Sequence, residues 1–173
     1  MALSLYDVSV SSFLQVLGGV AGFLERGAGH CNANNIALRE VVETRLYPDM
    51  FPFSFQIASV AHHSLGAMRG VQAGVFRPPA GVPALDYAGL QSLVVEARAE
   101  LQKLSREAVD GLEGRDVIFQ LGERSMPFTA EGFLLSFSLP NLHFHATTAY
   151  DILRMKGVPL GKRDYLGQPR MKA

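Results

Sequence analysis

The chain has 173 residues, enough for one domain with a sizeable buried core. Hydrophobic residues make up 48 % of it and charged residues 18 %, proportions typical of a soluble globular protein. Its 16 basic and 16 acidic side chains cancel, so composition predicts neither nucleic-acid binding nor attraction to an anionic membrane. We expect a single domain over residues 1–173.

Cysteine usage and the apolar segments bear on the compartment. Cys31 is the single cysteine, which excludes an internal disulfide and favours a reducing environment. The start of the chain carries Asp7 and lacks the basic segment of a secretory signal. The longest apolar stretch, residues 13–24, is shorter than the ~20 residues of a membrane span. These features predict a cytoplasmic protein that does not interact with membranes.

Helical periodicity begins near the start of the chain. Ser4 and Asp7 have the spacing of a capping box, so we expect a helix from there to about residue 26, ended by Gly27 and Gly29. The helix has one apolar face, because hydrophobic residues recur every three or four positions: Phe13, Leu17, Val20 and Leu24. A short accessory helix, capped by Asn34 or Asn35, is expected to reach about residue 46.

Two further long helices follow. Prolines between residues 47 and 52 interrupt the chain, and a helix rich in small residues is predicted from about 53 to 72. Residues 77–83 contain three prolines and predict a loop. Apolar residues at helical spacing then predict another long helix over about residues 90–108, ended by Gly111.

The last third of the chain mixes a hairpin with helix. Residues 117–121 are β-prone, and a turn at 122–124 leads to a second strand that Pro127 confines to a sheet edge. Thr129 is expected to cap a segment to residue 138, and Pro140 to open a fresh helix that stops at Gly157. The polar tail, residues 161–173, is expected to lie over the surface. The chain as a whole predicts an all-α four-helix bundle with a small β-hairpin.

His63 and His145 fall on two helices that can face each other across such a bundle. Two imidazoles meeting there could ligate a metal, transfer protons, or make a buried polar contact. Side chains on the same helical stripes are expected to line a pocket around them: Gln56 and Ser59 beside His63, and Asn141 and Thr148 beside His145.

A complete metal site needs more than this pair, because catalytic zinc usually takes three protein ligands. His143 lies roughly 200° round the helix from His145 at ~3.6 residues per turn, so the two cannot point into one site. His62 lies about 100° from His63 and is a weaker candidate ligand. Asn141 stands one turn before His145, but an amide is a poor ligand for zinc or nickel.

Three segments give the chain a family resemblance: Arg45-Leu46-Tyr47-Pro48-Asp49-Met50-Phe51-Pro52-Phe53, Thr147-Thr148-Ala149-Tyr150-Asp151-Ile152-Leu153-Arg154, and Gly157-Val158-Pro159-Leu160-Gly161-Lys162-Arg163-Asp164-Tyr165-Leu166-Gly167. The opening residues 3–7 and Pro140-Asn141 before His145 fit the same pattern. With them, the chain resembles a bacterial family of unknown function in the DinB/YfiT-like superfamily of metalloenzymes. The resemblance covers nearly the whole chain.

The resemblance implies an up-down-down-up four-helix bundle, often dimeric. Better-studied members hold a divalent metal with one histidine from the second bundle helix and two from the last, and some transfer or hydrolyse low-molecular-weight thiol conjugates or isomerise with such a thiol. By position, His63 matches the first ligand and His145 one of the other two. Ala149, one turn after His145, stands where the family pattern has a further histidine.

Two functions therefore stay open. One is a metal-dependent enzyme, a hydrolase or thiol transferase acting on a small molecule, in which Zn²⁺ or Ni²⁺ is held by His63 and His145 with His62 or a water. The alternative is a bundle that binds a small molecule or a protein without chemistry. In either case we expect a homodimer, paired through the small residues of positions 11–22 or formed elsewhere. The alternative role for those small residues is to seat a helix of the same chain.

Overall fold

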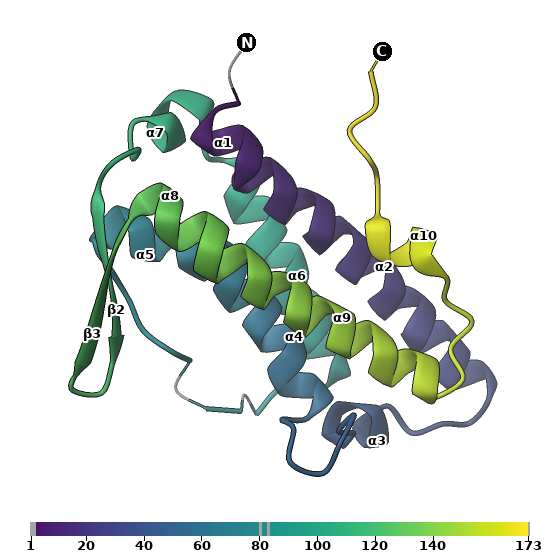
Figure 1. Ribbon diagram of the computed structural model, residues 1–173. Coiled ribbons are helices and arrows are strands. Elements are labelled where there is room, and N and C mark those ends of the chain that lie inside the picture. Colours follow the sequence, from purple (N-terminus) through teal and green to yellow (C-terminus); the bar gives the residue numbers. More distant parts are fainter. Residues whose placement is uncertain (1–2, 80, 83, 173) are drawn as a thin grey trace.

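Four long helical segments lie side by side around one apolar core (Figure 1). The computed structural model describes residues 3–79, 81–82 and 84–172. The segments are α2 (Val10–Ala33), the continuous run of α4 (Phe53–Ala61), η1 (His62–Gly66) and α5 (Ala67–Ala73), then α6 (Tyr87–Gln102), and the run of α8 (Ala130–Phe133), η2 (Leu134–Ser138) and α9 (Leu139–Met155). α2 packs against α6 and α9, and α4 packs against the same two helices from the other side. The prediction of a mostly helical protein is confirmed.

The first helix starts where the sequence predicted and ends later. Ser4 caps α1 (Leu5–Val8) through the predicted capping box with Asp7, and the chain bends at Ser9 into α2. The expected stop at Gly27 is wrong, because α2 continues to Ala33. Gly27 is a packing residue: a Cβ there would lie 2.5 Å from the hydroxyl oxygen of Tyr87, which donates a buried hydrogen bond to the carbonyl of Leu24.

The accessory helix is shorter than predicted. α3 (Leu38–Glu43) has Ala37 at its N-cap and no side-chain cap, so the expected capping by Asn34 or Asn35 is wrong. Asn35 instead adopts a positive φ of 55°, which places it in the connecting turn. The longer helix from Phe53 is confirmed, and it stops at Gly74 with a φ of 73°.

One predicted helix is two helices in the structure. α6 begins at Tyr87, where the side chain of Asp86 caps it, and ends at Gln102. A separate short helix, α7 (Arg106–Asp110), starts after the Ser105 hydroxyl accepts a hydrogen bond from the amide of Ala108. The apolar spacing continues across the break, because both helices bury their hydrophobic positions in the same core.

The predicted hairpin is confirmed and belongs to a larger sheet. β2 (Asp116–Leu121) pairs antiparallel with β3 (Arg124–Thr129), and Pro127 lies on the edge strand as expected. A two-residue strand, β1 (Val75–Phe76), adds a parallel partner on the other side of β2. The expectation of an all-α chain with one hairpin is corrected to a mostly helical chain with a three-stranded sheet. A strand of two residues leaves no periodic signal in a sequence.

The last long helix runs without interruption through the expected break. Thr129 caps it as predicted, and Gly157, with a φ of 86°, lies just past its end. The expectation of a fresh helix at Pro140 is wrong. The π-turn η2 lies directly before this proline, so the α-helical hydrogen-bond ladder is already interrupted where the proline lacks its N–H.

The tail contains a helix that the sequence did not predict. α10 (Lys162–Leu166) packs across α2, where Arg26 pairs with Asp164 and the Gln15 amide donates to the Leu166 carbonyl at 3.0 Å. A Cβ at Gly19 would collide with the backbone carbonyl of Tyr165. Part of the small-residue face of α2 is thus covered by the chain's own C-terminal helix.

Residues 5–33 form a helical segment long and apolar enough, by length and composition, to cross a membrane. In the structure half of its most apolar window is buried against other helices, as in the core helix of a soluble protein. The fold is compatible with a soluble protein.

A pair of neighbouring glycines tests the α2–α10 contact. Gly19→Ala should destabilise the protein by about 1–3 kcal/mol, because the added methyl meets the Tyr165 backbone. Gly18→Ala should be neutral or stabilising by up to about 1 kcal/mol, since a Cβ there meets nothing within 4 Å and alanine favours the helix. Urea unfolding of both variants measures the difference; equal midpoints would contradict the packing described for α10.

Candidate functional site

Two π-turns face each other where the α4–α5 run packs against α9. η1 carries His63, and η2 ends at Ser138. The Ser138 hydroxyl donates a buried hydrogen bond of 2.7 Å to the backbone carbonyl of His63. Within η1, the Ser64 hydroxyl donates to the carbonyls of Val60 and Ala61. Serine side chains thus satisfy carbonyls around the interrupted ladder, and π-turns are frequent at functional sites.

The rings of His63 and His145 lie against each other at this junction. Their centroids are 5.7 Å apart and their planes differ by 14°. His63 comes from the first turn of η1 and His145 from the second turn of α9. The structure therefore brings together the two histidines that the sequence singled out, 82 positions apart in the chain.

Gln56 fixes the orientation and tautomer of His145. Its amide nitrogen donates to the Phe51 carbonyl at 2.9 Å, so its oxygen faces His145 and accepts from Nδ1 at 2.7 Å. His145 Nδ1 must then carry the proton, and Nε2 keeps its lone pair. Gln56 is 2 % exposed, so this hydrogen bond is made away from water.

His63 has the opposite situation. Its Nδ1 atom is buried and has no hydrogen-bond partner among the described residues. The rings of Phe76 and Phe137 lie 5.6 and 5.8 Å from the imidazole, so its surroundings are largely aromatic. A buried polar atom without a partner calls for an explanation, because most such atoms are hydrogen-bonded.

Both imidazoles are neutral at physiological pH. Burial, followed by the nearby His62 and His145, lowers the pKa of His63 to about 3. Burial, followed by His62, lowers the pKa of His145 to about 4. Both geometry and charge state thus present ring nitrogens that can accept a hydrogen bond or bind a cation.

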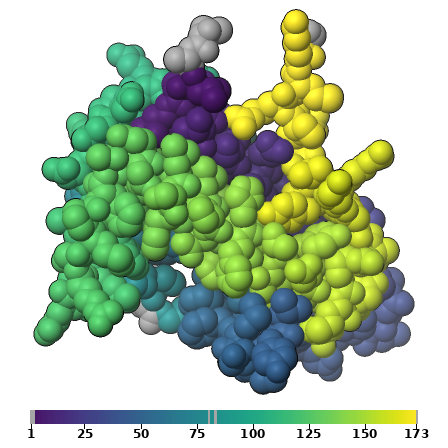
Figure 2. Space-filling view, viewed as in Figure 1, coloured from purple at the N-terminus to yellow at the C-terminus, as the bar shows by residue number. Residues whose placement is uncertain are grey.

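An aromatic surface lies next to His145, and the sequence reasoning missed it. The rings of Phe55 and Phe144 lie 5.9 and 5.2 Å from the imidazole, and Phe51 stacks on Phe55 at 4.1 Å. Phe51 and Phe144 are 53 % and 56 % exposed. Figure 2 shows the surface of α9, in green, directly beside the blue surface of the segment that precedes α4. The signal available in the sequence was the alternation of phenylalanines at 51, 53 and 55 and the Phe144-His145 pair.

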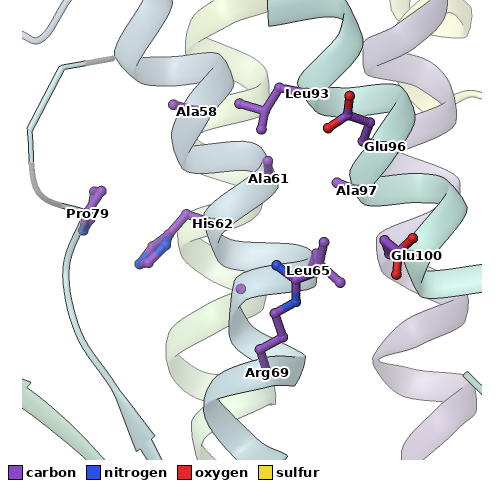
Figure 3. Close-up of a pocket in the computed structure, with 11 residues that line it drawn as sticks. Ala58, Ala61, His62, Leu65, Arg69, Pro79, Leu93, Glu96, Ala97 and Glu100 are labelled. Atoms are coloured by element: carbon purple, nitrogen blue, oxygen red, sulfur yellow. The ribbon is translucent and has the colours of Figure 1, made fainter. Parts of the chain in front are cut away.

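His62 faces a different part of the molecule from the pair. Its Nε2 lies 2.8 Å from the carbonyl oxygen of Arg77, and burial lowers its pKa. The ring borders a cavity of about 330 Å³ between α4–α5 and α6, with Arg69 on its own side and Glu96 and Glu100 on the facing helix (Figure 3). The ring still touches His63 edge-on, at a centroid distance of 5.4 Å.

The other predicted residues take local roles. The Asn141 amide donates to the carbonyl of Phe137 and the Thr148 hydroxyl to that of Phe144, each at 2.8 Å and each within its own helical run. Ser59 is buried on α4, 1 % exposed. His143 points away from the pair and lies 3.1 Å from the Tyr165 hydroxyl, as the helical spacing predicted.

The donor set is short of a three-ligand metal centre. The pair supplies two imidazole nitrogens, and the position one turn further along α9 is the fully buried Ala149. Within residues 3–79, 81–82 and 84–172, no group of three histidine, cysteine or acidic side chains is placed to hold a metal ion. The residues present do not fit the three-histidine pattern.

The fold and the paired histidines define a DinB-like helical protein. A crystal structure of a DinB family member protein from Shewanella denitrificans superposes with a TM-score of 0.78, covering 98 % of this chain and 95 % of that one at 22 % identity. At that identity the likeness shows the fold. The chain belongs to the family described as Domain of unknown function (DUF1993), whose model matches residues 5–166. A search of curated proteins found no match.

Acid should destabilise the protein through the histidine pair. As pH falls below about 6.5, the unfolded chain binds protons that the folded chain does not bind until pH 4 or 3, so stability is lost on acidification. The slope should approach about 1.4 kcal/mol per pH unit per histidine. Urea unfolding between pH 7 and pH 4.5 measures it, and His63→Phe should remove one histidine's share. A slope unchanged in this variant would contradict the neutral state of His63.

The Gln56 hydrogen bond should be worth a measurable fraction of the stability. Gln56→Leu leaves the His145 N–H and the Phe51 carbonyl without their partner, at a cost of about 1–3 kcal/mol. Gln72→Leu, exposed on α5, is the matched control and should change stability by less than about 0.5 kcal/mol. Nitrogen chemical shifts of His145 should report protonated Nδ1 in the parent chain; protonation at Nε2 would overturn the assigned tautomer.

Proposed function

We propose that this chain is an up-down-down-up four-helix bundle of DinB type that binds a small molecule at the His63–His145 pair, without a three-ligand metal centre. The observation that carries the proposal is the unpaired, buried Nδ1 of His63 beside an imidazole whose Nε2 lone pair is free. A bound molecule that donates a hydrogen bond would satisfy one of these nitrogens.

The surroundings favour a ligand that is mostly apolar. Phe55 and Phe144 flank His145, and Phe76 and Phe137 flank His63. Aromatic rings pack well against other rings in stacked or edge-on geometry. The neutral pair adds one or two hydrogen-bond acceptors, which together describe an aromatic or aliphatic molecule with a single hydroxyl or N–H group.

A divalent metal is the second candidate, and the same unpaired nitrogen of His63 favours it. Two neutral imidazoles are ligands of the kind that zinc and nickel accept. With Ala149 in the third position, the protein would hold such an ion more weakly than a three-histidine site does. The two candidates differ in whether zinc or a neutral molecule binds.

Nuclear magnetic resonance of the histidine rings separates the two. We expect p-cresol, whose hydroxyl can donate to His145 Nε2, to shift the ring signals of His63 and His145, with the effect lost in His63→Gln and His145→Gln. Loss of one charge-neutral hydrogen bond corresponds to a change in affinity of about two- to tenfold. His143→Gln is the matched control and should bind as the parent chain does, because His143 faces Tyr165.

Zinc titration of protein without a histidine tag is the second arm. Stoichiometric uptake at micromolar zinc, abolished by His63→Gln, would support the metal candidate over the proposal. Absence of any p-cresol effect, or equal effects in His145→Gln and the parent chain, would contradict the proposed ligand class.

A further inference from the structure

A second cavity lies on the opposite side of the helical core, between α2, α6 and α10. Its volume is about 350 Å³. Glycines of α2 form one wall and charged side chains from all three helices form the others: Gly18, Gly19, Gly22, Arg26, Arg98, Arg163, Asp164, Gly167 and Gln168. The proposed ligand site lies between α4 and α9, so this cavity is separate from it.

Three arginines from distant parts of the chain converge on this cavity. Arg26 pairs with Asp164 and also donates to the Pro159 carbonyl at 2.8 Å. Within the part of the chain that the structure describes, Arg98 and Arg163 take part in no ion pair. The cavity therefore has three guanidinium groups against one carboxylate, a surplus of two positive charges in a chain whose net charge is zero.

Gathering like charges costs free energy, because they repel one another more strongly beside a low-dielectric wall than in bulk water. A dianion in the cavity would remove that repulsion. Guanidinium groups also match the tetrahedral oxygens of phosphate with parallel hydrogen bonds. We propose that the cavity binds the phosphate group of a small phosphorylated molecule, which carries close to two negative charges at neutral pH.

The glycine wall leaves room for the rest of such a molecule. A Cβ at Gly18 or Gly22 would meet nothing within 4 Å, so packing inside the chain does not require glycine at either position. Glycine inside a helix costs about 1 kcal/mol relative to alanine. At both positions its effect is to keep the cavity open beside the arginines.

Calorimetric titration with phenyl phosphate and with inorganic phosphate tests the site. We expect both to bind, and affinity to fall as sodium chloride is raised, because exposed charges are screened. Arg98→Gln combined with Arg163→Gln should weaken binding about tenfold or more. The double variant Arg115→Gln, Arg124→Gln removes the same charge from exposed positions outside the cavity and should bind as the parent chain does.

A second variant leaves every charge in place. Gly22→Leu should fill the cavity and abolish binding of phenyl phosphate, whereas Gly29→Leu, equally open on α2 but outside the cavity, should not. Vesicles containing phosphatidic acid provide the other arm: arginine-dependent binding to them alone would support the phosphate site and assign its source to a lipid headgroup.

Three outcomes would overturn the proposal. Equal loss in the two arginine double variants would mean that net charge alone attracts phosphate. Unchanged binding in Gly22→Leu would place the anion elsewhere. A dimer that Gly22→Leu converts to monomers, with no phosphate binding by the parent chain, would make this face an interface between two copies.

Discussion

The junction of the two π-turns is the constraint on which the site depends. The buried hydrogen bond from Ser138 to the His63 carbonyl joins two helical runs at the point where both lose their regular ladder. In a regular helix each carbonyl is taken up one turn later, and neither a serine from another helix nor a proline at position 140 would be accommodated easily. The same irregularity places His63 opposite His145 and lets Pro140 remain inside a continuous helix. Fold and site therefore share one local deviation from α-helical geometry.

Burial sets what the paired imidazoles can do. Water around a histidine favours its charged form, and the aromatic rings around this pair exclude much of that water. Gln56 then selects one tautomer of His145, so a free nitrogen is left on a known atom. The contrast with the three-histidine pattern rests on one methyl group: at Ala149 the core is filled by a side chain that cannot ligate. The site keeps the position of a DinB centre and presents a different set of atoms.

Overall neutrality conceals an uneven distribution of charge. Sixteen positive and sixteen negative side chains cancel along the sequence, yet three arginines from residues 26 to 163 line one small cavity. Composition argues correctly against a surface-wide attraction, which depends on total charge. It is silent on local surpluses, because these depend on which helices become neighbours, and α10, the helix that brings Arg163 there, was itself not predicted.

The sequence by itself determined the helical segments whose signals are local. The capping box at Ser4, the cap at Thr129, the stop at Gly157 and the edge proline of the hairpin each act within a few residues, so they could be predicted. It also singled out His63 and His145, by helical stripe and by family resemblance. Tertiary structure decided the rest. Gly27 stays helical because Tyr87 packs on it, β1 exists because β2 lies beside it, and the tautomer of His145 follows from Gln56, 89 positions earlier in the chain. These outcomes depend on contacts between distant residues, whose free energies outweigh the small local preferences of a glycine or a two-residue strand.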